Sequence, residues 1–446
     1  HHLLSTMTIR LLPALALAGL LTAASSAQPP AASDAKAKEL FKTGKFDDAL
    51  KELRALAKAD PKLPPARVTL ADWFFQAGQG QPARLNLEAA AAEDPYHPSV
   101  YLLNGSFAFG EGRVTDCILS CKTVLQLIAD PRWDKAQRDR YEREARTGLA
   151  RSYEVRGDWT SAQDQLTEIL KDDDKNGPAR QRLATCLFRL GKPDAAFAEL
   201  RKAHDVDPAS ELPELRMAGL ANDPKDPTKA EEWLKKAVAN HPKSADAVRT
   251  YSGWLLDAGR IDEAQKYLDL TVKLDPDSRE TRAVQGIMAR YRKDLPGAEK
   301  VFEELNRKHP NYPLAAWNLA LVLADSGDKE KQRRAVEVAQ AEVSRNQKLA
   351  EGFAVLGWAL YKAGRLDDAE KALAPLVQPG VGVPSRDAAY FLARVLADKG
   401  RFEDARKALQ AAESAKGGYV YRDEAQKLMA EVEKKIPPPK KDEKKK

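Results

Sequence analysis

The sequence has few of the residues that mark catalytic, metal-binding or disulfide-rich proteins. Of its 446 residues, 3 are cysteine, 6 are histidine and 7% are aromatic. The histidines are scattered along the chain, and there is no HExxH, GxSxG, glycine-rich phosphate loop or paired-carboxylate motif. We therefore expect a protein that is not an enzyme and that uses neither a metal nor another cofactor.

The few cysteines do not predict a disulfide framework. Cys117 and Cys121 are four residues apart on an expected helix. Their Cβ atoms should be about 5 to 6 Å apart, whereas a disulfide prefers about 3.8 Å. We expect both to be buried small apolar residues, with a redox or intermolecular role as the alternative. The sequence leaves open whether Cys117, Cys121 or Cys186 forms any disulfide.

The sequence also lacks an apolar run long enough to cross a membrane. Residues 1–6 precede Met7 and look non-native or over-extended, and residues 7–27 have the pattern of a signal peptide, followed by a linker at 28–33. The apolar part, 11–21, is interrupted by proline, and a bilayer span needs about 20 residues. We expect export to the periplasm or the medium, with no stable membrane span after cleavage.

No long stretch of the chain has charge of one sign except the end. The formal net charge is +6, and setting aside Arg10 and the lysine-rich tail at 436–446 leaves about +2 on the remainder. We expect this tail to be disordered, since it cannot form a packed element. A balanced surface argues against a nucleic-acid partner, because such a site would concentrate basic charge.

One ten-residue sequence motif, which we call the phrase, appears four times with small changes. GRLDDAEKAL at 364–373 returns with small changes at 44–53, 259–268 and 400–409. Its glycine suits the left-handed backbone that ends one helix, and its two aspartates suit the first turn of the next, where the helix dipole favours negative charge. The alanine and leucine that follow are four apart, on one helix face. The phrase predicts two helices joined by a tight turn.

The phrase belongs to a longer repeat with a period of 34 residues. A small residue marks the second helix of each unit, at steps of 34 with three exceptions: Ala49, Ala83, Cys117, Ala162, Ala196, Ala230, Ala264, Ala298, Ala335, Ala369 and Ala405. Such units, with glycine in the turn and proline at the end, resemble the tetratricopeptide repeat family. The resemblance covers 34–417, about eleven units. It implies an all-α fold, a right-handed α-solenoid, with a capping helix at 418–435.

Four departures from the period are visible. Eleven extra residues fall in the polar stretch 132–146, which we expect to lengthen a first helix into a protruding charged helix, either a docking surface or, as its mixed charges favour, a solvated extension. Residues 222–227 should shorten another first helix. Three residues are inserted in the turn that begins at Gly327, and a linker spans 378–384.

The family resemblance implies a concave groove lined by the first helices, which takes a peptide. By position, the groove candidates in the last four units are Arg290, Tyr291, Trp317, Asn318, Trp358, Tyr361, Lys362, Tyr390 and Arg394. Aromatic and arginine side chains are typical of binding hot spots. The alternative is that these rings simply pack between helices. The lysine and asparagine clamp with which some relatives hold a carboxylate is absent, because Val68, Asp72, Leu102 and Ser106 stand in its places.

These patterns lead to one functional hypothesis and one alternative. The first is a scaffold or adaptor of the bacterial cell envelope that binds protein or peptide segments in the groove. The alternative is an assembly component of a secretion or polysaccharide-export machine that uses its outer surfaces. The sequence does not identify the partner, the pathway or the oligomeric state.

Overall fold

The structure is a computed structural model that describes residues 34–436, except 61, 224–225, 347–348, 378–384 and 415–417. The expected start at 1–6, signal peptide at 7–27, linkers at 28–33 and 378–384, and tail at 437–446 lie outside the described residues. The chain divides into two compact units near Pro213 and Glu214. Each unit is described by itself.

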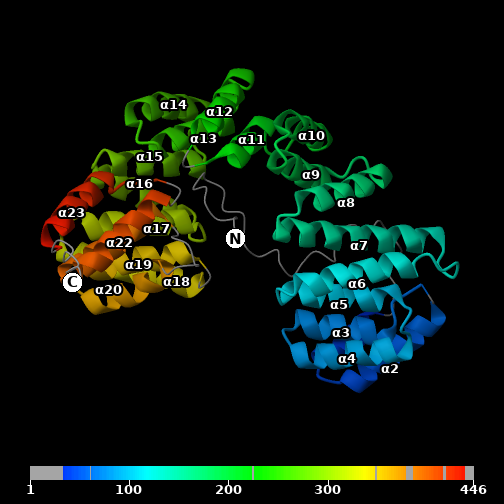
Figure 1. Cartoon of the computed structure of the whole chain (residues 1–446). Helices are drawn as coiled ribbons and strands as arrows, with labels where there is room; N and C mark the ends of the chain where they lie inside the picture. Colours follow the sequence, from blue (N-terminus) through cyan, green and yellow to red (C-terminus); the bar gives the residue numbers. More distant parts are fainter. Residues whose placement is uncertain are drawn as a thin grey trace, which may run out of the picture. The chain divides into compact units, whose positions relative to one another are not determined.

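Both units consist of helical hairpins in which a first helix is followed by an antiparallel second helix (Figure 1). The N-terminal unit contains α1 (Asp34–Lys42), α2 (Phe46–Ala59), α3 (Ala66–Gln76), α4 (Gly80–Glu93), α5 (Pro98–Gly110), α6 (Val114–Leu127), α7 (Lys135–Arg156), α8 (Trp159–Asp172), α9 (Gly177–Arg189) and α10 (Pro193–Val206). These ten helices make five hairpins, as the repeat predicts.

The C-terminal unit contains six further hairpins and one closing helix. Its elements are α11 (Pro213–Ala221), α12 (Thr228–Asn240), α13 (Ala245–Asp257), α14 (Ile261–Leu274), α15 (Arg279–Tyr291), α16 (Leu295–Lys308), α17 (Pro313–Asp325), α18 (Lys329–Arg345), α19 (Ala350–Lys362), α20 (Leu366–Leu373), the 3-10 helix η1 (Ala374–Val377), α21 (Arg386–Asp398), α22 (Phe402–Ser414) and α23 (Arg422–Lys435). The described residues contain no β-strand beyond one isolated bridge, Asp223 to Asp226. The predicted α-solenoid of about eleven units is confirmed.

The turn inside a hairpin requires a residue with positive φ. Gly364 has φ of 81°, and its N–H and that of Arg365 donate to the carbonyls of Tyr361 and Leu360, both at 2.9 Å. These bonds satisfy carbonyl groups that the end of α19 would otherwise leave free. Lys293 takes the glycine's place in one turn, with φ of 60°, a conformation that costs about 1 to 2 kcal/mol for a residue with a Cβ.

Small residues allow the two helices of each hairpin to approach closely. The ten alanines that mark the second helices are fully buried, and Cys117 is 3% exposed in the equivalent place. Cys117, Cys121 and Cys186 are all free and buried, as was expected of Cys117 and Cys121. First helices of successive hairpins also contact one another, among them α13, α15, α17, α19 and α21 in order.

The eleven-residue insertion lengthens α7 to 22 residues, as predicted, but the expected protrusion is wrong. Trp133 and Tyr141 are 6% and 2% exposed, and their rings pack edge-on with each other and with the ring of His97, which begins α5. Asp134 caps α7 and also pairs with Lys62 at 3.3 Å, in the loop after α2. The added turns therefore fold back over the N-terminal hairpins.

Two other departures from the regular repeat change the lengths of α11 and α18. The first helix α11 has only 9 residues, as predicted for the stretch that ends it. The three residues inserted after Gly327 do not enlarge the turn but lengthen α18 to 17 residues, because Asp328 caps the helix immediately. In the part of the chain that the structure describes, no helix is both long and apolar enough to traverse a bilayer.

Candidate functional site

The capping helix predicted at 418–435 is a helix only from Arg422. The preceding residues, 418–421, are not helical, and we call them the closing segment. From Arg422 onward α23 packs on α21 and α22 through Ala425, Leu428 and Val432. The closing segment instead crosses the face formed by the first helices of the C-terminal unit, where the groove was predicted.

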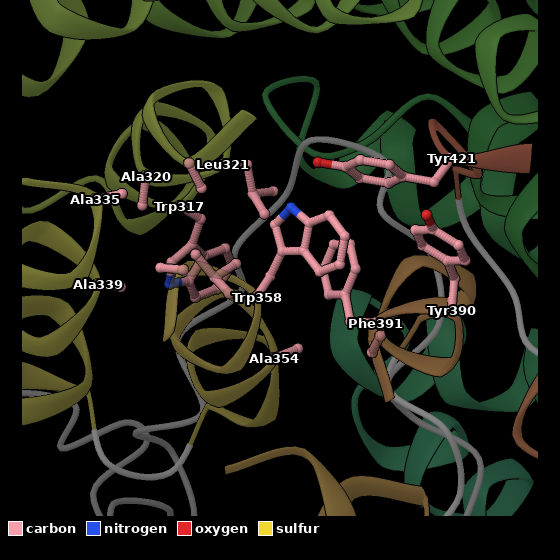
Figure 2. Packing of buried hydrophobic residues seen from close by; sticks show 14 of the residues in the cluster. Trp317, Ala320, Leu321, Ala335, Ala339, Ala354, Trp358, Tyr390, Phe391 and Tyr421 are labelled. Atoms are coloured by element: carbon pink, nitrogen blue, oxygen red, sulfur yellow. The ribbon is translucent and has the colours of Figure 1, made fainter. Parts of the chain in front are cut away.

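Tyr421 lies at the centre of this face, among the aromatic residues predicted for the groove (Figure 2). It is 4% exposed, and its ring stacks on Tyr390 at 5.5 Å between centroids and meets Trp358 edge-on at 5.4 Å. Trp358 in turn stacks on Phe391 at 4.5 Å and on Tyr361 at 5.0 Å. Five rings from α19, α21 and the closing segment thus form one packed cluster, which we call the aromatic cluster.

The polar end of Tyr421 enters a buried hydrogen-bonded network. Its hydroxyl donates to Asp325 at the end of α17, and Arg290 Nη2 approaches the same hydroxyl at 3.4 Å. Arg290, only 6% exposed, also donates to Asn318 Oδ1 at 2.7 Å. Trp358 Nε1 donates to the other oxygen of Asp325 at 3.0 Å. Each of these buried groups has a partner, as a low-dielectric site requires.

Main-chain and charged contacts hold the closing segment and the start of α23. The N–H of Tyr419 donates to Tyr291 Oη at 2.9 Å. Lys293, the residue with the strained turn conformation, pairs with Glu424 at 2.7 Å. Arg422 Nη2 donates to the carbonyl of Asp257 at 3.4 Å, a contact between residues 165 apart in sequence. The closing segment and the start of α23 together therefore contact first helices of hairpins far apart in the chain.

Burial raises the pKa of three carboxyl groups around this face. Asp257, Glu351 and Asp387 each have a pKa raised to about 7, chiefly because the charged form loses hydration. Asp387 accepts a hydrogen bond from the N–H of Tyr421 at 3.4 Å, and Glu351 from Ser385 Oγ at 3.3 Å. Near neutral pH this face is therefore rich in half-protonated carboxyl groups.

Most of the predicted groove residues come together, and they contact the chain itself. Arg290, Tyr291, Trp358 and Tyr390 touch the closing segment directly. Asn318 is held by Arg290 and by the carbonyl of Leu314. The structure thus gives these candidates a packing partner that the sequence did not indicate.

Four further candidates belong to the aromatic cluster, as Tyr361 does, or lie beside it. Tyr361 donates to Asp398 at 2.6 Å and accepts from Arg394 Nε at 3.2 Å, while Lys362 pairs with Asp325 at 3.5 Å. Trp317 differs, because its Nε1 points toward Gly352 at the start of α19 and has no hydrogen-bond partner among the described residues. Trp317 is 7% exposed and packs against the start of α19.

Sequence reasoning missed Tyr421, Asp325 and Asp387. Asp325 and Asp387 lie at helix ends, where acidic residues are common and carry no distinctive signal. Tyr421 gave a usable signal, because the stretch Tyr419-Val420-Tyr421 is apolar and aromatic immediately before a highly charged helix. In the described residues no group of three or more potential ligands is placed to hold a metal ion.

Comparison with known proteins decides the family. Family models described as "Tetratricopeptide repeat" match residues 284–346 and 355–419 in one case, and residues 40–103, 156–218 and 221–291 in another. Together these matches cover well over half of the chain. The chain belongs to the tetratricopeptide repeat family. Its repeats are protein-interaction modules, and the eleven hairpins are the structural form of that family.

Individual relatives are distant. The repeats are 28% identical over 168 residues to the type IV pilus assembly protein PilF of Pseudomonas aeruginosa, a match that covers 36% of this chain. It spans 65% of that relative, slightly less than two thirds of its length.

Two solved structures are also similar to the repeats. Yeast Tom70 matches with 17% identity and a TM-score of 0.38, over 91% of this chain and 95% of that one. A tetratricopeptide repeat protein from Parabacteroides merdae matches with 14% identity and a TM-score of 0.38, over 66% and 99%.

Proposed function

We propose that this chain is a non-enzymatic scaffold of the bacterial cell envelope that binds a partner's polypeptide segment across the first helices of the C-terminal unit. The observation that carries the proposal is the closing segment itself. A stretch of polypeptide already lies on this face, with a tyrosine ring in the aromatic cluster and its hydroxyl on Asp325. A partner segment with an aromatic residue can use the same contacts.

In this proposal the partner competes with the closing segment. The two would exchange because each buries an aromatic ring and satisfies Asp325 and Arg290, so the difference in free energy between the two states stays small. Arg394 and Lys362, at the edge of the cluster, are half-buried and would hold acidic groups of the partner. The groove candidates thus act as a binding site once the closing segment leaves.

A photo-crosslinking amino acid at Arg394 tests the proposal in intact cells with the native envelope. We expect crosslinks to a protein partner from this position, and more of them when Tyr421→Ala weakens the closing segment. The matched control carries the crosslinker at Leu270 on α14, which is 36% exposed and faces outward. Partner crosslinks at Leu270 alone, with none at Arg394, would contradict binding on the first-helix face.

The similarity to a pilus assembly protein favours one second candidate. Here the chain would be an assembly component of an envelope machine, and its outer helix faces would make the contacts. The same experiment separates the two, since the assembly hypothesis requires crosslinks at Leu270 to named components of such a machine. Fractionation of cells, with mass spectrometry of the N-terminus, tests the proposed export and cleavage after Ala27.

A further inference from the structure

A cavity of about 370 Å³ lies in the N-terminal unit, apart from the aromatic cluster. Its walls come from the end of α2 and from α3, α5 and α7. Leu56, Val68 and Leu102 supply apolar surface. The volume is in the range of sites that enclose a small ligand or one or two side chains of a peptide.

The insertion in α7 forms one wall of this cavity, opposite α3 and α5. The pair between Asp134 and Lys62, and the packing of Trp133 on His97, hold the start of α7 against the preceding hairpins. Tyr141 and Glu144, one turn apart on α7, then line the cavity. The longest departure from the repeat thus supplies one wall of the cavity.

Polar atoms in the lining lack partners. The Tyr141 hydroxyl, on a side chain only 2% exposed, has no hydrogen bond among the described residues, and neither does Asp34 Oδ1, although Asp34 Oδ2 pairs with Lys38 at 2.7 Å. Glu144 makes no hydrogen bond or ion pair with described residues, and Asp72 bonds only to Gln76, at 2.7 Å. Burying polar groups without partners is costly, so a ligand that satisfies them gains affinity.

The lining of the cavity contains more acidic side chains than basic ones. Asp34, Asp72 and Glu144 bring three carboxyl groups, against the single guanidinium of Arg140, which stands over the Tyr141 ring at 4.7 Å. Burial raises the pKa of both Asp72 and Glu144, because their charged forms lose hydration, and the nearby Arg140 and Arg143 offset this only in part for Glu144. A cation in the cavity would remove that cost.

We infer that the cavity binds a protein segment that presents a lysine or arginine beside a leucine-sized apolar side chain. The apolar side chain fills the space between Leu56 and Leu102, and the cation pairs with Glu144 and Asp72. The Tyr141 hydroxyl accepts a hydrogen bond from the cation or from the segment's backbone. This site is independent of the aromatic cluster and does not require the closing segment to move.

End-blocked fluorescent hexapeptides that differ only at two central positions test this inference on the full chain. We expect a Leu-Lys peptide to bind saturably, and Leu-Glu and Ser-Lys peptides to bind at least about tenfold more weakly. No saturable binding of the Leu-Lys peptide would overturn the inference. Equal binding of the Leu-Glu peptide would also overturn it, because the acidic lining would then play no part.

Substitutions locate the site. Glu144→Gln should weaken the Leu-Lys peptide about tenfold, and Leu102→Phe should block it by filling the cavity. Asp139→Asn is the matched control, because Asp139 is on the same helix, carries the same charge and pairs only with exposed Lys135. Equal weakening by the control would reduce the effect to general charge and overturn the site. Unfolding curves confirm that each variant is folded.

Two further measurements identify the occupant. Arg394→Ala should leave binding of the Leu-Lys peptide unchanged, so failure of the envelope crosslinking experiment and failure of this site are distinguishable. If spermidine competes for the site as strongly as the peptide, the ligand is a small polyamine and the inference is wrong. It is also wrong if the peptide binds only after residues 1–33 are removed, because the occupant is then this chain itself.

Discussion

Gly286 and Gly253 are both glycines in the middle of first helices, but only one of them is enclosed. A Cβ built on Gly286 would lie 2.5 Å from the ring of Phe302, which is fully buried on α16. A Cβ on Gly253 would meet nothing within 4 Å. The same residue type therefore has a packing role at one position and none at the other.

Gly286→Ala should destabilise the C-terminal unit by about 1 to 3 kcal/mol, because the buried ring has no space to move away. Gly253→Ala should be neutral or stabilise by up to about 1 kcal/mol, since alanine favours the helix. Urea unfolding of the two variants measures both effects. Equal stability of the two variants would show that the Phe302 ring adjusts at little cost.

His97 combines burial with a capping role. Its Nδ1 accepts from the N–H of Ser99 at 3.3 Å, and the ring is 6% exposed beside Trp133. Burial lowers the pKa of His97 to about 4, from its ordinary 6.5. The folded chain thus keeps the ring neutral where the unfolded chain binds a proton.

His97 should make the N-terminal unit less stable in acid. Because the pKa is lower in the folded state, stability is full above about pH 6.5 and is lost as the pH falls toward 4, by up to about 3 kcal/mol. His97→Asn keeps a capping acceptor and removes the titration. Urea unfolding at about pH 6.5 and about pH 4 should show a smaller loss of stability for the variant than for the unsubstituted chain. An equal loss would assign the acid sensitivity to other groups.

At the scale of elements, the hairpins were predictable and their irregular additions were not. The same local features, a turn glycine, an acidic first turn and a buried alanine, recur from hairpin to hairpin. Because the contacts that these residues make are local in sequence, each unit can be recognised from its own sequence. The expected charged protrusion at 132–146 was wrong because its mixed charge was given more weight than Trp133, Tyr141 and Ala145. Tyr141 and Ala145 are four residues apart on one face of α7, Trp133 lies just before the helix, and all three are buried. That spacing was a signal available in the sequence.

The start of the last helix was missed for another reason. The period describes contacts between neighbouring units, whereas Tyr421 contacts Asp325 and Arg290, 96 and 131 residues away. Nothing in a 34-residue repeat specifies such a contact. The candidate groove was therefore predicted from position, but what covers it was not.

Tyr421→Phe should loosen α23 without removing the ring from the aromatic cluster. Asp325 Oδ2 would lose the Tyr421 donor while Trp358 still donates to Oδ1, and a buried acceptor atom without a partner costs about 1 to 3 kcal/mol. Hydrogen exchange of the amides in α23 should become faster. Tyr267→Phe is the control, because the Tyr267 hydroxyl makes no hydrogen bond to described residues. Unchanged exchange in the Tyr421 variant would show that the ring alone holds the helix.

At the scale of the whole molecule, the two units should respond to pH in opposite senses. Asp257, Glu351 and Asp387 have pKa values raised to about 7 in the folded C-terminal unit. The folded state therefore keeps protons that the unfolded state releases near pH 4, and stability falls as the pH rises from about 4 through 7. His97 gives the N-terminal unit the reverse dependence.

Hydrogen exchange on the full chain at about pH 5 and about pH 8, corrected for intrinsic exchange rates, measures this difference. Protection in α13, α15 and α21 should be greater at the lower pH, and protection in α5 and α7 greater at the higher pH. Asp387→Asn should flatten the response of the C-terminal unit only. Parallel changes in both units would mean that these groups do not govern stability.

The contact between Arg422 and Asp257 has a consequence for biosynthesis. Most repeat arrays can fold progressively as they leave the ribosome, since each hairpin needs only its neighbour. Here the first-helix face of the C-terminal unit stays uncovered until residues 419–422 have been translated, and the contacts that these residues make with it have a high contact order. A nascent chain halted before Tyr421 would therefore leave this face, with the rings of Trp358 and Tyr390, exposed to solvent, chaperones and proteases.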